Sequence, residues 1–309
     1  MLRATQSLQQ GMDIRQNRVQ KLRQVTEKII GLPTLPTIVT QLISLVGDPR
    51  SSARDVAQLI STDQALTAKI LKVANSAFYG FARKIVTIQH AIVVLGFEAV
   101  KNLGLSVAVL KRFSSGTEHP LFDRQRFWEH AIACGVAGRM LARKFRHRRI
   151  EGEVFVGGIL HDVGKLILIE YFFEEFSGAL ELAEAEGIAI AEAEGRVLGV
   201  THAEMGGWLA EKWNLPPALV EAIAYHHHPF AGGHPGDAVI LFVHMGNALC
   251  RHLQIGCSGD RQGPQIDPEA ARKFKRGQEI ADGELLSRLS VGLKKELENA
   301  QIFKDLGEG

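Results

Sequence analysis

The amino-acid sequence predicts an all-α fold. Apolar residues recur at helical spacing through most of the 309-residue chain, and no useful length alternates apolar and polar residues as a half-buried strand does. Prolines, glycines and capping residues divide the chain into short segments. The chain is 46% hydrophobic and 23% charged, which is typical of a globular protein. We therefore expect a bundle of short helices around an apolar core.

Bulk composition excludes several classes of protein. A net charge of +2 is too small to indicate a nucleic-acid partner. Cys134, Cys250 and Cys257 are too few for a disulfide framework and fit no zinc-finger spacing, so we expect reduced thiols. No apolar run has the length of a membrane span, and the N-terminus lacks the pattern of a signal peptide. These features predict a cytoplasmic protein with no membrane partner.

The first part of the chain predicts short helices with tight connections. Residues 1–30 are polar and predict an N-terminal helical extension, which Pro33 and Pro36 end. Residues 31–115 then predict five or six helices. The first helix begins at residue 37 and ends at 47–49, and the second begins at a capping residue, 51 or 52. The third begins at a capping residue, 62 or 63, and ends before a turn at 75–80. The remaining helices run from a capping residue at 87 to residue 95 and over residues 98–110.

A second group of helices follows a polar Ser-, Gly- and Pro-containing boundary at residues 114–120. Thr201 and Glu204 have the spacing of a capping box, and Pro217 suits the first turn of a helix. The predicted helical stretches are 127–145, 154–173, 201–213, 217–225 and 237–253, and residues 174–194 are an acidic, amphipathic region. We expect a second subdomain over 120–255, which completes a domain of residues 31–255. A loop and a charged helical tail occupy 256–309.

Six histidines and one aspartate fall on the helices of this second subdomain. They are His130, His161, Asp162, His202, His226, His227 and His244. Imidazole and carboxylate groups ligate transition metals, and a helical bundle can direct them into one cavity from facing helices. A single helical histidine is more often a packed or surface residue, so the prediction depends on the joint pattern.

The two adjacent pairs, His161-Asp162 and His226-His227, favour a centre with two metals. Adjacent residues on a helix point about 100° apart, so one pair can reach two sides of one metal or two neighbouring metals. Two neighbouring metals can clamp the oxygens of a phosphate group. Lys165 follows His161 by one turn and could offer a positive charge to an anionic substrate.

Seven segments give the chain its resemblance to a known family. They are LPTLP (32–36), LKVANSAFYG (71–80), AIVVLG (91–96), GILHDVGK (158–165), THAEMG (201–206), WNLP (213–216) and HH (226–227). Residues 31–253 thereby resemble HDOD-domain proteins, bacterial relatives of the HD metal-dependent phosphohydrolases and of the HD-GYP cyclic dinucleotide phosphodiesterases. The resemblance implies an N-terminal helical subdomain packed on an HD-like helical bundle.

The resemblance also implies a set of metal ligands, with three departures. The ligands would be His130, His161, Asp162, His202, His226 and His227, holding two divalent ions of Fe, Mn, Ni, Co or Zn. HD-type enzymes close this set with an aspartate in a later helix, where we place His244. The segment ending Gly-Tyr-Pro in HD-GYP enzymes is missing after His227, and Arg126 stands where some of them have a glutamate.

Two function classes therefore stay open. The first is a regulatory signal-transduction module whose metal site is structural or binds a ligand. The second is an active phosphohydrolase of nucleotides or cyclic dinucleotides, in which Asp162 and Lys165 would be catalytic. The partner would be a signalling protein or a phosphorylated small molecule, and the chain could form a homodimer.

DNA binding is a lesser alternative. Residues 91–105 predict a helix, a glycine turn and a second helix with too few basic or amide side chains for recognition. The basic run 143–149 is interpreted as a solvated face or as an anion contact near the metal site.

Overall fold

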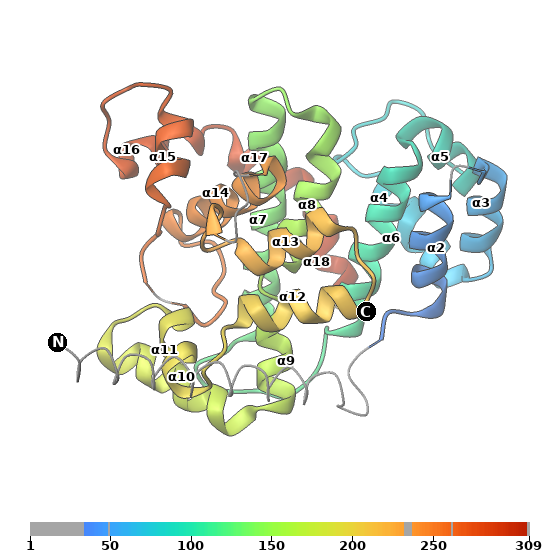
Figure 1. Cartoon of the computed structure of the whole chain (residues 1–309). Coiled ribbons are helices and arrows are strands. Elements are labelled where there is room, and N and C mark those ends of the chain that lie inside the picture. Colours follow the sequence, from blue (N-terminus) through green and yellow to red (C-terminus); the bar gives the residue numbers. More distant parts are fainter. Residues whose placement is uncertain (1–33, 49, 232–236, 261, 308–309) are drawn as a thin grey trace.

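The computed structural model describes residues 34–307, except residue 49, residues 232–236 and residue 261 (Figure 1). The predicted N-terminal extension over residues 1–30 lies outside this part of the chain. No described residue belongs to a strand, and an isolated bridge joins His119 to Phe122. The all-α prediction is therefore confirmed.

The helices follow one another in this order: α2 (Thr37–Gly47), α3 (Ala53–Ser61), α4 (Gln64–Ala74), α5 (Ile88–Leu95), α6 (Phe97–Arg112), α7 (Arg124–Lys144), the 3-10 turn η1 (Arg148–Ile150), α8 (Glu151–Leu160), α9 (Val163–Tyr171), α10 (Phe173–Glu186), α11 (Ile190–Val197), α12 (His202–Lys212), α13 (Pro217–Tyr225), α14 (Ala238–His252), α15 (Pro268–Lys275), α16 (Asp282–Leu289), α17 (Leu293–Asn299) and α18 (Ile302–Gly307).

Local sequence accounts for the starts of the N-terminal helices. Ser52 forms a capping box with Asp55 at α3, Asp63 caps α4, and Thr87 caps α5. Gly96 then adopts a φ of +89°, a conformation that L side chains rarely adopt, and the chain bends by 119° between α5 and α6. Helices α2–α5 gather on one side of the molecule, and α6 connects them to the remaining bundle (Figure 1).

The second subdomain is built around α7, which packs along both α8 and α14. Glycines make this approach possible. A Cβ on Gly158 would lie 2.4 Å from the Cα of Gly135, and one on Gly246 would lie 2.7 Å from the carbonyl oxygen of Cys134. Any side chain at these positions would force the helices apart. The three helices therefore form a closely packed core that positions the C-terminal end of α8.

The predicted helical stretch over residues 154–173 is divided in the structure. Helix α8 ends at Leu160 and α9 begins at Val163, so His161 and Asp162 occupy the junction. The junction directs α9 onto α12, where Gly164 packs against the His202 backbone. The prediction of one helical stretch over residues 154–173 is therefore wrong, and the histidine–aspartate pair lies at a break.

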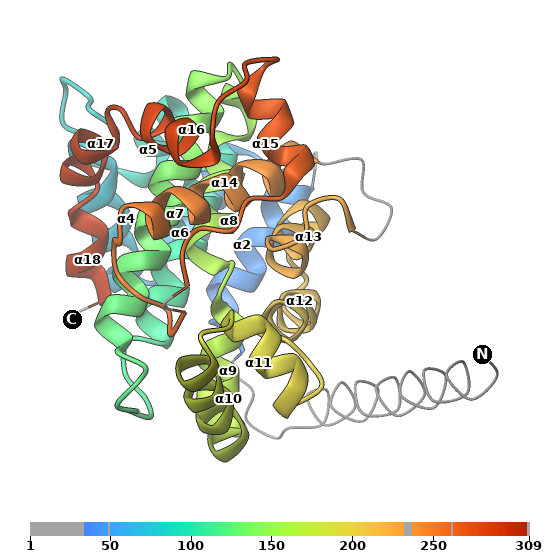
Figure 2. The same cartoon turned by 90° about the vertical axis from the view of Figure 1, so that its left-hand side faces the viewer.

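The C-terminal tail packs on this core. Helix α16 contacts α14, α17 contacts α7, and α18 contacts α4, α6 and α7 (Figure 2). Phe303 of α18 is fully buried, and its ring lies 5.0 Å from that of Phe78 and 4.8 Å from that of Phe155. The tail thus contacts helices from both parts of the chain, before and after residue 120.

Within the described ranges no single helix is long and apolar enough to cross a membrane, and only α5 and α6 taken together across their bend meet that criterion.

Candidate metal centre

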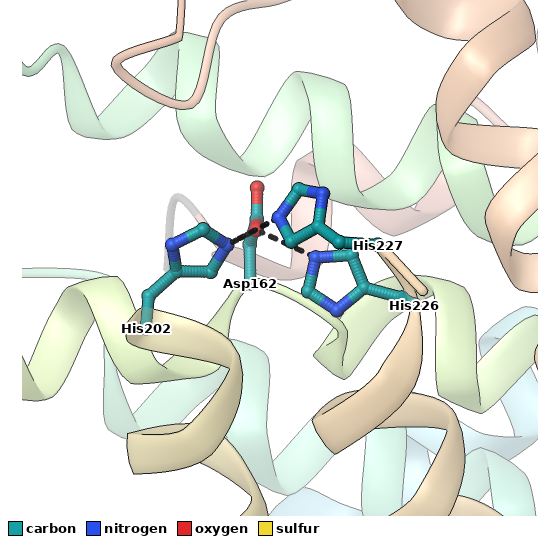
Figure 3. A group of neighbouring side chains, drawn as sticks. All are labelled: Asp162, His202, His226 and His227. Atoms are coloured by element: carbon teal, nitrogen blue, oxygen red, sulfur yellow. Dashed lines mark hydrogen bonds and ion pairs between the residues drawn. The ribbon is translucent and has the colours of Figure 1, made fainter. Parts of the chain in front are cut away.

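Four predicted ligands meet at one point in the second subdomain (Figure 3). Asp162 comes from the α8–α9 junction, His202 from the first turn of α12, and His226 and His227 from the end of α13. Each residue offers one ligand atom, and these atoms lie within 4.8 Å of one another. Three separate parts of the chain therefore supply one candidate site.

The distances within this group suit a small cation. Asp162 Oδ1 lies 3.1 Å from His202 Nε2 and 3.6 Å from His226 Nε2. The Nε2 atoms of His202 and His227 are 3.0 Å apart. Ligands about 2 Å from a common ion are separated from one another by roughly these distances.

The protonation of three histidines supports this interpretation. The Nδ1 atoms of His161, His202 and His226 each face an oxygen that only accepts hydrogen bonds: Gly158 O at 2.7 Å, Glu194 Oε2 at 2.6 Å and Ile223 O at 2.8 Å. Each Nδ1 therefore carries a hydrogen, and in a neutral ring Nε2 keeps its lone pair.

These lone pairs face the carboxylate of Asp162, which also only accepts hydrogen bonds. Within the described chain, His161 Nε2, His226 Nε2 and Asp162 Oδ1 are buried without a hydrogen-bond partner. Such groups are costly to bury unless a proton or a cation lies between them. A divalent transition metal would satisfy all of them, so the residues present fit the expected metal.

Glu194 is a supporting residue that the sequence did not identify. It lies on α11, is fully buried, and its Oε2 accepts hydrogen bonds from His202 Nδ1 and from the His202 backbone nitrogen at 2.7 Å. A carboxylate behind a ligating histidine fixes the ring and strengthens it as a ligand. Glu194 precedes His202 by eight residues on another helix, and no local pattern marks it.

Asp162 links this group to a second one. Its Oδ2 lies 3.3 Å from His161 Nε2 and 2.8 Å from Lys165 Nζ. Lys165 is 2% exposed, and it also donates a hydrogen bond to Ser258 Oγ at 3.0 Å. The predicted position of Lys165, one turn beyond His161, thus brings its ammonium group to the centre. Ser258, from the loop after α14, was not predicted.

The second group contains His130, Cys134 and His161. Cys134 lies one turn after His130 on α7, and its Sγ is 3.4 Å from His130 Nε2. Asn247 Oδ1 lies 3.1 Å from the same Nε2, and His130 Nδ1 lies 3.2 Å from the Ile255 carbonyl oxygen, so an ion at this Nε2 would replace the contact with Asn247. Spacing of four residues on one helix could have identified Cys134, which the prediction did not consider. The Cys134 thiol and the Asn247 amide oxygen are both polar groups that suit a cation beside His161.

His244 is not brought into either group. Its Nδ1 donates to the His226 carbonyl oxygen at 2.8 Å, and its Nε2 accepts from the Asp267 backbone nitrogen at 3.0 Å. Both ring nitrogens are therefore engaged with backbone, so the expected ligand role of His244 has no support here. On α14 the residue that faces the histidines is Asn247, and His244 instead anchors the segment carrying His226.

Burial and charge set the protonation of the centre. Burial lowers the pKa of His130 to about 4 and the pKa values of His226 and His227 well below the usual range. Burial opposes a charge on Asp162, but His161 and Lys165 outweigh it and lower its pKa. Burial also opposes a charge on His202, yet Glu194 raises its pKa. His130, His226, His227 and Asp162 are therefore in their metal-binding protonation states near neutral pH. The raised pKa of His202, and the pKa of Cys134, which burial raises well above its usual value, mean that a cation has to displace a proton from these two residues.

Two other sequence interpretations concern regions outside the centre. Every residue from Val100 to Leu110 on α6 is buried, so this helix presents little surface to a DNA groove. The basic run 143–149 precedes α8, and the metal centre lies at the opposite end of that helix. The expected anion contact near the metal site therefore has no support, whereas residues 146–149 are exposed, as the alternative of a solvated face expects.

A model of the HDOD domain matches residues 32–229. An uncharacterised protein of Treponema pallidum is 26% identical over 204 residues, which are 66% of this chain but only 39% of that protein. An HDOD-domain protein of unknown function from Geobacter sulfurreducens has a similar structure, with a TM-score of 0.75, 26% identity, and coverage of 94% of this chain and 98% of its own.

Two further solved structures share the fold. A protein of Shewanella amazonensis provisionally assigned as a phosphohydrolase has a TM-score of 0.63 and 23% identity over 92% of this chain and 96% of its own. A protein of Marinobacter aquaeolei provisionally assigned to signal transduction has a TM-score of 0.70 and 21% identity over 96% of this chain and 66% of its own.

Proposed function

This chain belongs to the HDOD domain family, and we propose that it is a bacterial signal-transduction module whose histidine–aspartate centre binds divalent transition metals. The burial of the centre carries the proposal. His161, His202 and His226 have no exposed surface, and Asp162 is 1% exposed. These four side chains offer almost no surface to a phosphate ester, and in the group around Asp162 only His227 is partly exposed. The metals would therefore stabilise or switch the fold.

We propose two metal positions that share Asp162. The first would be held by Asp162 Oδ1, His202, His226 and His227, and the second by His130, Cys134 and His161 beside Asp162 Oδ2. Imidazole and carboxylate ligands suit Zn, Fe, Mn, Co or Ni, and a thiol at the second position favours the softer ions among them. Lys165 and the second ion would compete for Asp162 Oδ2.

Active phosphohydrolysis is the second candidate, and the buried ammonium of Lys165 favours it. A bound metal would supply Lewis-acid catalysis and activate water. In that case Lys165 would leave Asp162 to hold a phosphate oxygen, and Asp162 would orient the attacking group. The hydrogen bonds from Lys165 to Asp162 and Ser258 would have to break first. This requirement, together with burial, ranks hydrolysis second.

The metal content of purified protein tests the centre. We expect bound transition metal in the wild-type chain and its loss in the variant His161→Ala/Asp162→Ala. Equal metal content in the two proteins would refute the site. Hydrolysis of cyclic dinucleotides and simple phosphoesters, assayed with several divalent metals, then separates the two candidates. Metal-dependent turnover that disappears in this variant would support the phosphohydrolase.

A further inference from the structure

A cavity lined by charged, polar and aromatic side chains lies between the two subdomains, away from the metal centre. Its volume is about 560 Å³, within the range of roughly 300–1,000 Å³ for small-molecule sites. The loop after α4 and helices α5 and α6 form one wall, and α7, η1 and the start of α8 form the other. A ligand here would therefore contact both subdomains at once.

Arginine side chains dominate the charge of this cavity. Arg148 and Arg149 on η1 are exposed, and neither forms an ion pair with a described residue. Arg143 is bonded to Glu151 at 3.0 Å, so that carboxylate is already neutralised. Glu98 of the lining is paired with Lys101. Glu153 of the lining has no ion pair with a described residue, so two unpaired guanidinium groups outnumber one unpaired carboxylate. Guanidinium suits phosphate oxygens geometrically.

The opposite wall offers aromatic rings and an amide. The rings of Tyr79 and Phe81 are nearly parallel, at 9°, and Phe81 is 42% exposed. Asn102 is only 5% exposed, and its Oδ1 has no hydrogen-bond partner among the described residues. An exposed aromatic ring suits stacking by a planar heterocycle, and a buried amide without a partner suits hydrogen bonds to one.

We propose that this cavity binds a nucleoside phosphate. Its phosphate would lie against Arg148 and Arg149, and its base would lie against Phe81 with Asn102 in reach.

Helix α8 connects the cavity with the metal centre. It has ten residues, or about 15 Å, and it ends immediately before His161. A ligand that shifts the start of α8 would therefore move His161. This coupling between the two sites rests on the proposed metal-binding function, whereas the binding of a nucleoside phosphate does not. If the nucleoside phosphate changes the affinity for the metal, the metal must change the affinity for the nucleoside phosphate by the same factor.

Calorimetric titration of the full chain with AMP, GMP, guanosine and inorganic phosphate tests the site. Monophosphates are preferred because they chelate metal weakly. We expect a nucleoside monophosphate to bind more tightly than guanosine or phosphate alone. The variant Arg148→Gln/Arg149→Gln should weaken this binding at least tenfold. The control Arg54→Gln/Arg272→Gln removes two exposed arginines elsewhere and should change it less than twofold.

Three results would overturn the proposal. They are no binding of either monophosphate at millimolar concentration, equal weakening in both double variants, and binding that is lost in His161→Ala/Asp162→Ala but kept in Arg148→Gln/Arg149→Gln. The last result would place the ligand at the metal centre. Continued nucleotide binding by the metal-site variant would support a separate cavity, whatever its metal content. Equal affinity for Co²⁺ with and without saturating GMP would refute the coupling.

Discussion

Replacing Glu194 by glutamine should weaken metal binding without unfolding the protein. Glu194 Oε2 lies 2.6 Å from His202 Nδ1 in a fully buried setting, so its charge acts directly on a proposed ligand. Glutamine keeps an acceptor of the same shape but removes the charge that raises the pKa of His202. Loss of such a supporting carboxylate typically lowers metal affinity 10- to 100-fold, or about 1.4–2.8 kcal/mol.

Competition with a chromophoric chelator measures the affinity for Zn²⁺ or Co²⁺ directly. Glu204→Gln is a matched control, because Glu204 caps the same helix, α12, through Thr201 and does not contact the centre. It should lower stability by about 1 kcal/mol and leave metal affinity unchanged. NMR titration of the metal-free protein should also show a lower pKa for His202 in Glu194→Gln. Equal metal affinity in Glu194→Gln and the wild type would refute the orienting role.

Three further predictions follow from the same geometry. Gly164→Ala should lower the free energy of unfolding by about 3 kcal/mol or more, because its Cβ would lie 1.9 Å from the His202 carbonyl oxygen. Gly195→Ala, whose Cβ meets nothing within 4 Å, should raise it by up to about 1 kcal/mol, and thermal denaturation compares the two variants. In metal-free protein, His130 binds a proton only near pH 4, but in the unfolded chain near pH 6.5, so the stability it contributes is present above pH 6.5 and is lost as the pH falls towards 4. Urea titrations at pH 7.5 and 5 should therefore differ by about 2 kcal/mol more in the wild type than in His130→Gln, and an equal pH dependence would contradict this assignment. Cys134→Ala should remove the ion at the second position and leave the first filled, which metal analysis checks against the wild-type chain; unchanged metal content in Cys134→Ala would exclude the thiol as a ligand.

Local sequence was sufficient to predict where most of the helices begin and end. Thr87 and the pair Thr201 and Glu204 mark helix starts because a side-chain oxygen must accept from the free backbone nitrogens there, and the structure has these caps. The one clear failure was the stretch over residues 154–173. Its apolar residues continue without a proline, so nothing local marks the junction at His161.

The sequence alone determined the all-α class and most of the residues at the centre, because helix periodicity, caps and histidine positions are local properties of the chain. Tertiary structure decided which atoms meet. Asn247 faces His130 whereas His244 turns to backbone, although residues three apart on a helix differ by only about 60° in direction. The packing of α14 on α7 sets that rotation, and the docking of α11 beside α12 brings Glu194 to His202. Contacts between distant segments depend on how helices pack, which no local pattern contains.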